Sequence, residues 1–119
     1  MKRIIMAISL LTTFVLSGVG FAQTEPEHIK HVREARQHVT MAVTEGEKGD
    51  AKALVQHAQV GLDHVRMAQK EKQLADLDKA ATSLEGAISQ GQAGDVKKAT
   101  EQAKESVEYL DAVLSGLGG

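Results

Sequence analysis

The feature that most constrains the fold of this chain is an internal repeat. A shift of 45 positions places the apolar residues of the first half on apolar residues of the second half, beginning with Val32 on Leu77. The same shift places segment 46–50 (GEKGD) on segment 91–95 (GQAGD). A repeated unit of this length is one supersecondary structure that buries its apolar face against its copy. The sequence therefore predicts one hairpin, present twice.

Apolar residues recur three and four positions apart on both sides of each Gly-containing turn, which is the spacing of an amphipathic helix. The chain has one Pro in 119 residues, and it is dominated by good helix formers such as Ala, Glu, Lys and Leu. We therefore predict an all-α fold, an up-and-down antiparallel four-helix bundle built from a duplicated helical hairpin. The four apolar stripes are Val32, Ala35, Val39, Ala42 and Val43; Leu54, Ala58, Leu62 and Val65; Leu77, Ala80, Leu84, Ala87 and Ile88; and Ala99, Ala103, Val107 and Leu110.

The ends of the helices can also be predicted from local residues. Segment 24–27 (TEPE) has the pattern of a capping box that opens the first helix. Asp50 and Asp95 are expected to cap the second and fourth helices. Gly46 and Gly91 are expected to end the first and third helices.

The junction between the two hairpins is less clearly marked, because residues 69–75 contain neither Gly nor Pro. A tight turn there gives a monomeric bundle, which is our prediction. The alternative is a continuous helix from about 51 to 90, which would span roughly 60 Å. Such a helix would force the two hairpins into a swapped dimer.

The N-terminus has the three regions of a secretory signal peptide. Lys2 and Arg3 precede an apolar stretch over 4–16, and segment 20–22 (GFA) places small residues where cleavage after Ala22 requires them. We predict that residues 1–22 are a signal peptide and that residues 23–119 form one domain in the periplasm, free of the membrane after cleavage. The alternative is an uncleaved anchor, because 4–22 almost reaches the length that spans a membrane.

Composition argues against several classes of function. The absence of Cys removes disulfides, iron–sulfur clusters and thiol catalysis. A formal net charge of -2 and an aromatic content of 3% argue against a nucleic-acid binder. No nucleophile–base motif stands out, so we predict that the protein is not an enzyme.

The histidines are the part of the first hairpin that the second hairpin lacks. The apolar stripe is kept in both halves, so the histidines are not needed for folding. Functional use of these side chains is therefore the first hypothesis to consider. The five residues are His28, His31, His38, His57 and His64, and their counterparts are Gln73, Asp76, Ser83, Gln102 and Tyr109.

The register of the first hairpin pairs these histidines across its two helices. The turn is centred near residue 48, so His31 is level with His64 and His38 is level with His57. Both histidine faces turn either toward the shared groove or away from it. The rise of a helix separates the two levels by roughly 10 Å, so we expect two separate sites. The outer site would contain His28, His31, His64 and Met67, and the inner site would contain His38 and His57 with Met41 one turn away.

Imidazole and thioether groups are ligands for transition metals. Met41 and Met67 each follow a histidine in a His-x-x-Met pattern. Without thiolates this set favours copper, and imidazole also accepts zinc, nickel or cobalt. The sequence therefore predicts a metal-binding protein whose partners are metal ions.

Structural explanations exist for the same residues. Solvated histidines are common on helix surfaces, and methionines often fill gaps between helices. Glu27, Glu34 and Asp63 are interpreted as solvated helix faces, although any of them could complete a coordination shell.

The chain resembles the periplasmic small metal-binding protein family, whose members are His-rich copper-binding proteins. The resemblance covers about 28–114 and depends on segments 45–49 (EGEKG), 57–64 (HAQVGLDH) and 101–108 (EQAKESVE). It implies a four-helix bundle that binds copper and other divalent ions for storage or buffering. The family spreads histidines over all four helices, whereas here the second hairpin has none, which implies a lower capacity.

Two functions from different classes remain open at this point. The first is a periplasmic protein that sequesters or buffers copper through the histidines of its first hairpin. The second is a helical bundle that binds other proteins, for instance under stress, without any metal.

Overall fold

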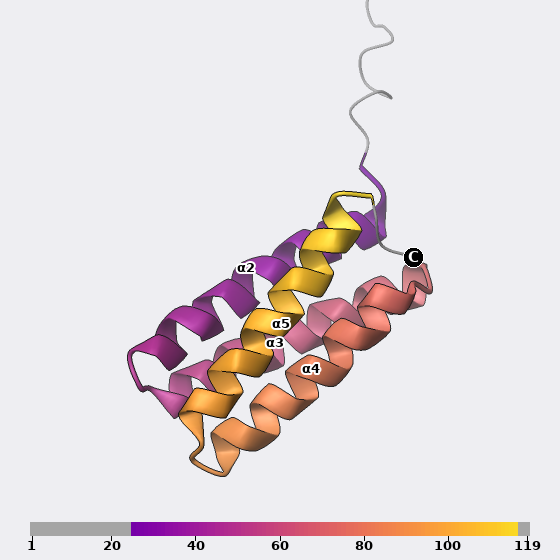
Figure 1. The fold of residues 1–119 in the computed structure, drawn as a ribbon. Coiled ribbons are helices and arrows are strands. Elements are labelled where there is room, and N and C mark those ends of the chain that lie inside the picture. Colours follow the sequence, from indigo (N-terminus) through magenta and orange to yellow (C-terminus); the bar gives the residue numbers. More distant parts are fainter. Residues whose placement is uncertain (1–24, 117–119) are drawn as a thin grey trace, which may run out of the picture.

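The computed structural model describes residues 25–116, which form four helices and no strand. The helices are α2 (Glu27–Glu47), α3 (Ala51–Glu71), α4 (Ala75–Gln92) and α5 (Val96–Leu114). Consecutive helices are antiparallel, and α5 returns to pack against α2 (Figure 1). The predicted up-and-down four-helix bundle is confirmed. Residues 1–22 and Thr24 of the predicted capping box lie outside the described residues.

The core is built from small aliphatic side chains, so the helices approach one another closely. Val32, Ala35, Val39 and Ala42 of α2 are fully buried, and the stripes of the other helices are largely buried as well. The predicted stripe residues Val43, Leu62, Ile88 and Val107 lie at the edge of the core and are only partly buried. The second hairpin also buries three polar residues, which are Ser83, Thr100 and Ser106. The hydroxyl of Ser106 donates a hydrogen bond to the carbonyl of Ala80.

The two predicted Asp caps are confirmed, and the two predicted Gly stops are displaced. The first helix begins at Glu27, with Pro26 at its N-cap position and no side-chain capping hydrogen bond, which is later than the predicted capping box. The side chain of Asp50 accepts a hydrogen bond from the Ala53 N–H at 3.0 Å, and Asp95 accepts one from the Lys98 N–H at 3.1 Å. The first helix does not end at Gly46 but continues to Glu47. Its chain reversal falls at Gly49, whose φ of +87° is a left-handed conformation that favours glycine.

Gly46 lies inside α2, at a point where side chains of α3 and α5 pack too closely for any residue with a Cβ atom. A Cβ atom at this position would lie 2.6 Å from Cδ1 of Leu54 and would also collide with the Thr100 hydroxyl. The predicted stop was therefore wrong for a tertiary reason. Gly91 behaves in the same way, since α4 continues past it to Gln92.

The junction between the hairpins is a tight turn, as predicted. Helix α3 ends at Glu71, and Lys72 and Leu74 have extended backbone conformations before α4 begins at Ala75. The side-chain amide of Gln69 donates a hydrogen bond to Asp78 across this turn at 2.7 Å. This turn rules out the continuous helix from about 51 to 90 on which the swapped-dimer alternative depends.

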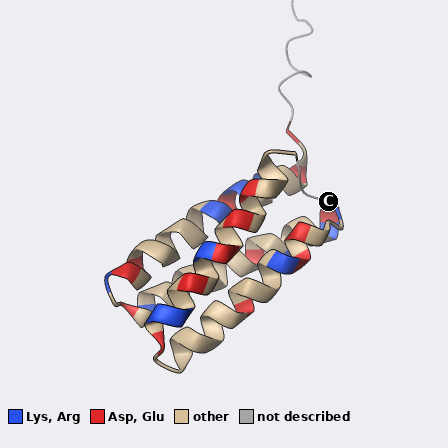
Figure 2. Ribbon diagram, viewed as in Figure 1, with Lys and Arg blue, Asp and Glu red and all other residues tan. Residues whose placement is uncertain are grey.

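The outer faces of the helices carry charges of both signs. On α5, basic residues occur only in the N-terminal half, and acidic residues continue toward the C-terminal end (Figure 2). Among the described helices, none is long and apolar enough to cross a membrane.

Candidate metal centre

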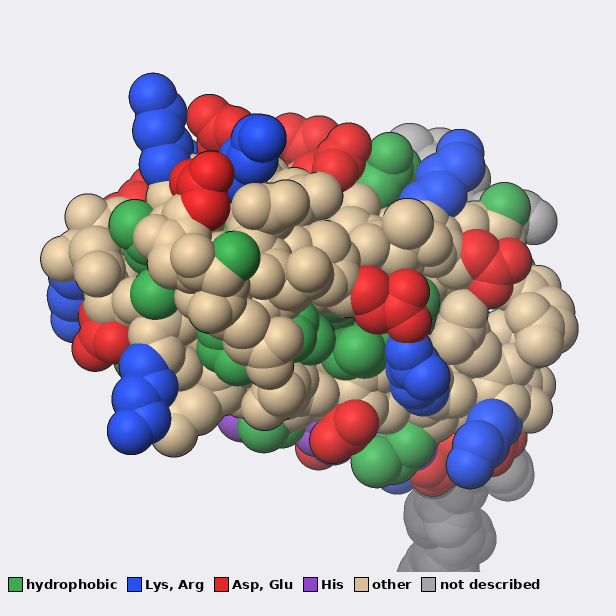
Figure 3. Space-filling view, turned by 90° about the horizontal axis from the view of Figure 1, so that it is seen from below, with side chains coloured by type: hydrophobic (Ala, Val, Ile, Leu, Met, Phe, Trp, Pro, Cys, Tyr) green, Lys and Arg blue, Asp and Glu red, His purple; other side chains and the backbone are tan. Residues whose placement is uncertain are grey.

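The groove between α2 and α3 contains four histidine side chains in a row. Helix α2 contributes His31 and His38, which are two turns apart on one face, and α3 contributes His57 and His64 with the same spacing. All four are half-buried. The histidine faces thus turn toward the shared groove, and we refer to these four residues as the histidine ladder. Histidine reaches the surface drawn in Figure 3 only at its edge, beside hydrophobic and acidic side chains.

The rings of the ladder follow one another at nearly constant spacing. The ring centres of His31 and His64 are 5.8 Å apart, and those of His38 and His57 are 6.2 Å apart. These are the two predicted pairs. The rings of His38 and His64 are also 5.8 Å apart and nearly parallel, with an angle of 9° between their planes.

The expected gap of roughly 10 Å between the two levels therefore does not extend to the imidazole rings. Counting helix rise locates only the Cα atoms. Side chains on a helix lean toward its N-terminus, so in antiparallel helices His38 and His64 lean toward each other. Their imidazoles meet between the two levels and join the rungs into one ladder.

A carboxylate joins one end of the ladder. Glu34 Oε1 lies 3.2 Å from Nδ1 of His64 and 3.9 Å from Nδ1 of His31. In the described part of the chain, His31, Glu34 and His64 form the group of three potential metal ligands whose ligand atoms all lie within 4.8 Å of one another. The sequence analysis interpreted Glu34 as one of three solvated acids, any of which could complete a coordination shell, and the structure brings Glu34 to the histidines.

Three nitrogen atoms of the ladder are buried without a hydrogen-bond partner. They are the Nδ1 atoms of His31, His38 and His64. Glu34 approaches His64 within hydrogen-bond distance but without the alignment of a hydrogen bond. A buried polar atom that lacks a partner costs about 1–3 kcal/mol. A metal ion accepts the lone pair of such a nitrogen, so this donor set suits a cation.

The carboxylate of this group is more exposed than its two imidazoles. The side chains of His31 and His64 are 24% and 20% exposed, whereas that of Glu34 is 56% exposed. An ion could therefore enter from solvent on the side of Glu34. The imidazoles would remain largely screened from water.

The other predicted ligands lie outside this group of three. His28 is half-buried near the start of α2, and Met67 is 41% exposed. Met41 lines a surface hollow that reaches Leu114 of α5. Metal ligation by His28, Met41 and Met67 stays a prediction.

The equivalent groove between α4 and α5 contains other side chains in place of the histidines. Ser83, which replaces His38, donates a hydrogen bond to Glu105 at 3.1 Å. Tyr109, which replaces His64, packs against the core with Lys79 Nζ 5.8 Å from its ring centre. This groove is an ordinary helix interface, so the ladder is an addition to the fold.

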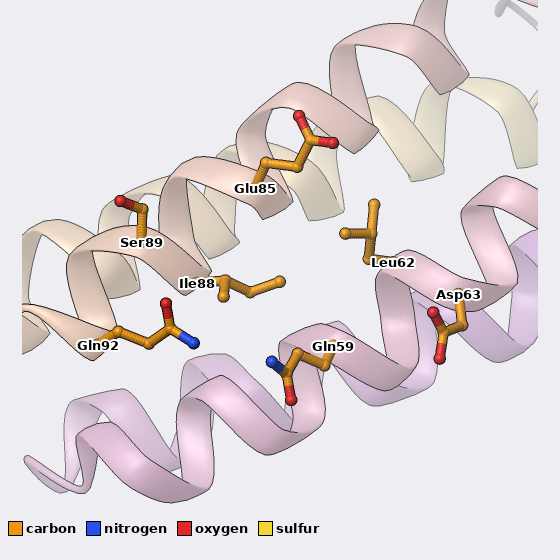
Figure 4. Close-up of a pocket in the computed structure, with 7 residues that line it drawn as sticks. All are labelled: Gln59, Leu62, Asp63, Glu85, Ile88, Ser89 and Gln92. Carbon is orange, nitrogen blue, oxygen red and sulfur yellow. The ribbon is translucent and has the colours of Figure 1, made fainter.

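A separate shallow hollow lies between α3 and α4 (Figure 4). The amides of Gln59 and Gln92 point toward each other across it, and Asp63 points away from it. Glu85 is the remaining acid of its lining, and no histidine contributes to it.

One comparison with known proteins identifies the chain. A family model described as small metal-binding protein matches residues 1–113. The chain therefore belongs to this family, which is not an enzyme family. No curated protein matches the sequence.

Proposed function

We propose that this member of the small metal-binding protein family binds copper through the histidine ladder and Glu34, and that it stores or buffers the metal without catalysing a reaction. The observation that carries the proposal is the convergence of His31, Glu34 and His64 beside buried nitrogens that lack partners. Membership of the family supports metal binding in general terms, and this geometry supports the groove between α2 and α3 as the place where the metal binds.

The ligand chemistry supports copper as the preferred metal. Imidazole and carboxylate bind most divalent first-row metals, and such sites favour Cu²⁺ over Ni²⁺, Co²⁺ and Zn²⁺ in the usual order of affinities. Four imidazoles with one carboxylate form a nitrogen-rich set with a single charge. Zinc, nickel and cobalt are therefore expected to bind more weakly at the same place.

A buffering role fits the exposure of the site. The Glu34 side of the groove is open to solvent, so bound metal can exchange with small ligands in solution. The protein would bind metal ions reversibly, so that the fraction of occupied sites follows the concentration of free metal around it.

The proposed location is the periplasm, which depends on cleavage of residues 1–22. Mass spectrometry of a periplasmic extract should detect a chain that begins at Gln23. Recovery of the intact chain from Met1 in the membrane fraction would contradict this location and favour the uncleaved anchor.

Calorimetric titration tests the proposed function. Copper, zinc and nickel salts are titrated into the purified protein, into His64→Ala and into Gln59→Ala, a control that changes an exposed polar residue of the same helix. We expect copper to bind most tightly, His64→Ala to weaken it by at least about tenfold, as even outer-shell changes do, and Gln59→Ala to have no effect. Unchanged binding in His64→Ala would exclude the ladder as the site, and an absence of binding by the parent protein would favour the interaction module.

A further inference from the structure

His64 lies midway along the ladder and has a neighbouring imidazole on each side. Its ring centre is 5.8 Å from that of His31 and 5.8 Å from that of His38. Resting on the proposed function, we infer that His64 is a shared ligand of two overlapping metal positions. The outer position consists of His31, Glu34 and His64, and the inner position consists of His38 and His57 with His64 as an exchangeable third ligand.

The ring spacings are suitable for an ion between each pair of neighbours. A metal ion bound about 2 Å from an imidazole nitrogen lies about 3 Å from the centre of that ring. Two rings with centres 5.8 Å or 6.2 Å apart can therefore both reach an ion between them once each ring is turned so that a nitrogen, whose lone pair lies in the ring plane, faces that ion. His64 and His38 both satisfy this condition on two sides, whereas His31 and His57 stand at the ends of the ladder. His64 also lies beside Glu34, which makes it the ligand that the outer position shares.

A neutral imidazole cannot serve two ions at the same time. One of its ring nitrogens carries a proton, which leaves a single lone pair for a metal. When His64 binds the outer ion, the inner position keeps only His38 and His57. When the outer position is empty or damaged, His64 is free to turn toward His38 and His57 and complete a three-histidine inner position, whereas without metal the close group is His31, Glu34 and His64.

Sharing therefore couples the two positions. The first ion has three protein ligands available wherever it binds, but the second ion has only those that the first has left. Repulsion between two cations in one groove acts in the same direction. We expect two binding steps, the second weaker than the first.

The decisive comparison uses two variants that each remove one imidazole from the outer position. His31→Ala releases His64 to the inner position, whereas His64→Ala removes the shared ligand itself. Outer-shell partners alone change metal affinity by about 10–100-fold, so the gain of a direct ligand should make the tightest site of His31→Ala at least about tenfold stronger than that of His64→Ala. Copper titrated into both variants by calorimetry measures this ratio.

Electron paramagnetic resonance gives a second readout that does not depend on affinity. With one equivalent of Cu²⁺, the nitrogen hyperfine pattern should indicate three imidazoles in His31→Ala and two in His64→Ala. Circular dichroism of each variant checks that the bundle is intact, which we expect because the second hairpin folds with Asp76 and Tyr109 at the corresponding positions. His57→Ala, which leaves the outer position complete, should retain a first step like that of the parent protein.

The outcomes separate this inference from the proposed function. Equal affinities and equal nitrogen counts in His31→Ala and His64→Ala, with tight binding by the parent protein, would show two independent positions and overturn the sharing of His64. An absence of copper binding by the parent protein would instead overturn the proposed function, and the inference with it.

Discussion

At the scale of single residues, Glu34 changes the character of the groove. It lies on α2 between His31 and His38, and its carboxylate points toward His31 and His64 rather than away from the bundle. Neutral imidazoles carry no negative charge that could offset the charge of a bound metal ion. A carboxylate at this place lowers the cost of bringing a divalent cation against half-buried nitrogens.

Glu34→Gln should therefore weaken copper binding while leaving the fold intact. The amide keeps the size of the side chain but removes its charge, so we expect a loss of about tenfold or more in affinity. The free energy of unfolding without metal should change by less than about 0.5 kcal/mol, as is usual for a surface substitution. Titration calorimetry and urea unfolding measure the two effects.

Glu101→Gln is the matched control, because Glu101 is an exposed acid of α5 on the other hairpin. An equal loss of affinity in both variants would mean that net charge, rather than the position of Glu34, determines metal binding.

At the scale of the helices, close packing determines where glycine is required. Gly46 and Gly86 both lie inside helices, where Ala would be favoured by about 1 kcal/mol on propensity alone. Their surroundings differ. A Cβ at Gly46 meets the fully buried Leu54 and the hydroxyl of Thr100, which is held by the carbonyl of Val96. A Cβ at Gly86 meets only the half-buried side chain of Gln102.

Gly46→Ala should consequently destabilise the protein. Overpacking a tight core costs about 1–3 kcal/mol, which exceeds the gain in helix propensity. Gly86→Ala should be neutral or slightly stabilising, because the Gln102 amide can rotate away. Urea unfolding followed by circular dichroism compares the two variants, and a Gly46→Ala protein as stable as the parent would show that α2 can shift to accept the methyl group.

At the scale of the whole molecule, folding and metal binding are separable. The buried core runs through both hairpins, including the one without histidine. Both hairpins also have the same Asp caps at the start of their second helix. The bundle therefore has no need of a metal ion to hold its helices together.

The protein should accordingly be helical in the presence of a chelator. Metal is expected to add only the stabilisation of a ligand that binds the native state, about 2.7 kcal/mol at a free concentration one hundred times Kd. Circular dichroism and thermal unfolding with and without copper test this. A coil spectrum that becomes helical on addition of copper would contradict it.

The sequence by itself was sufficient for the helices, the duplicated hairpin, the two Asp caps and the pairing of histidines across α2 and α3. These features depend on local spacing and on the register of an antiparallel hairpin, which residue numbers specify. Tertiary structure decided the approach of His38 to His64, the place of Glu34 at the site and the inclusion of Gly46 within α2. Side-chain tilt and the distance between helix axes control these features, and both depend on how the four helices pack rather than on any periodicity along the chain.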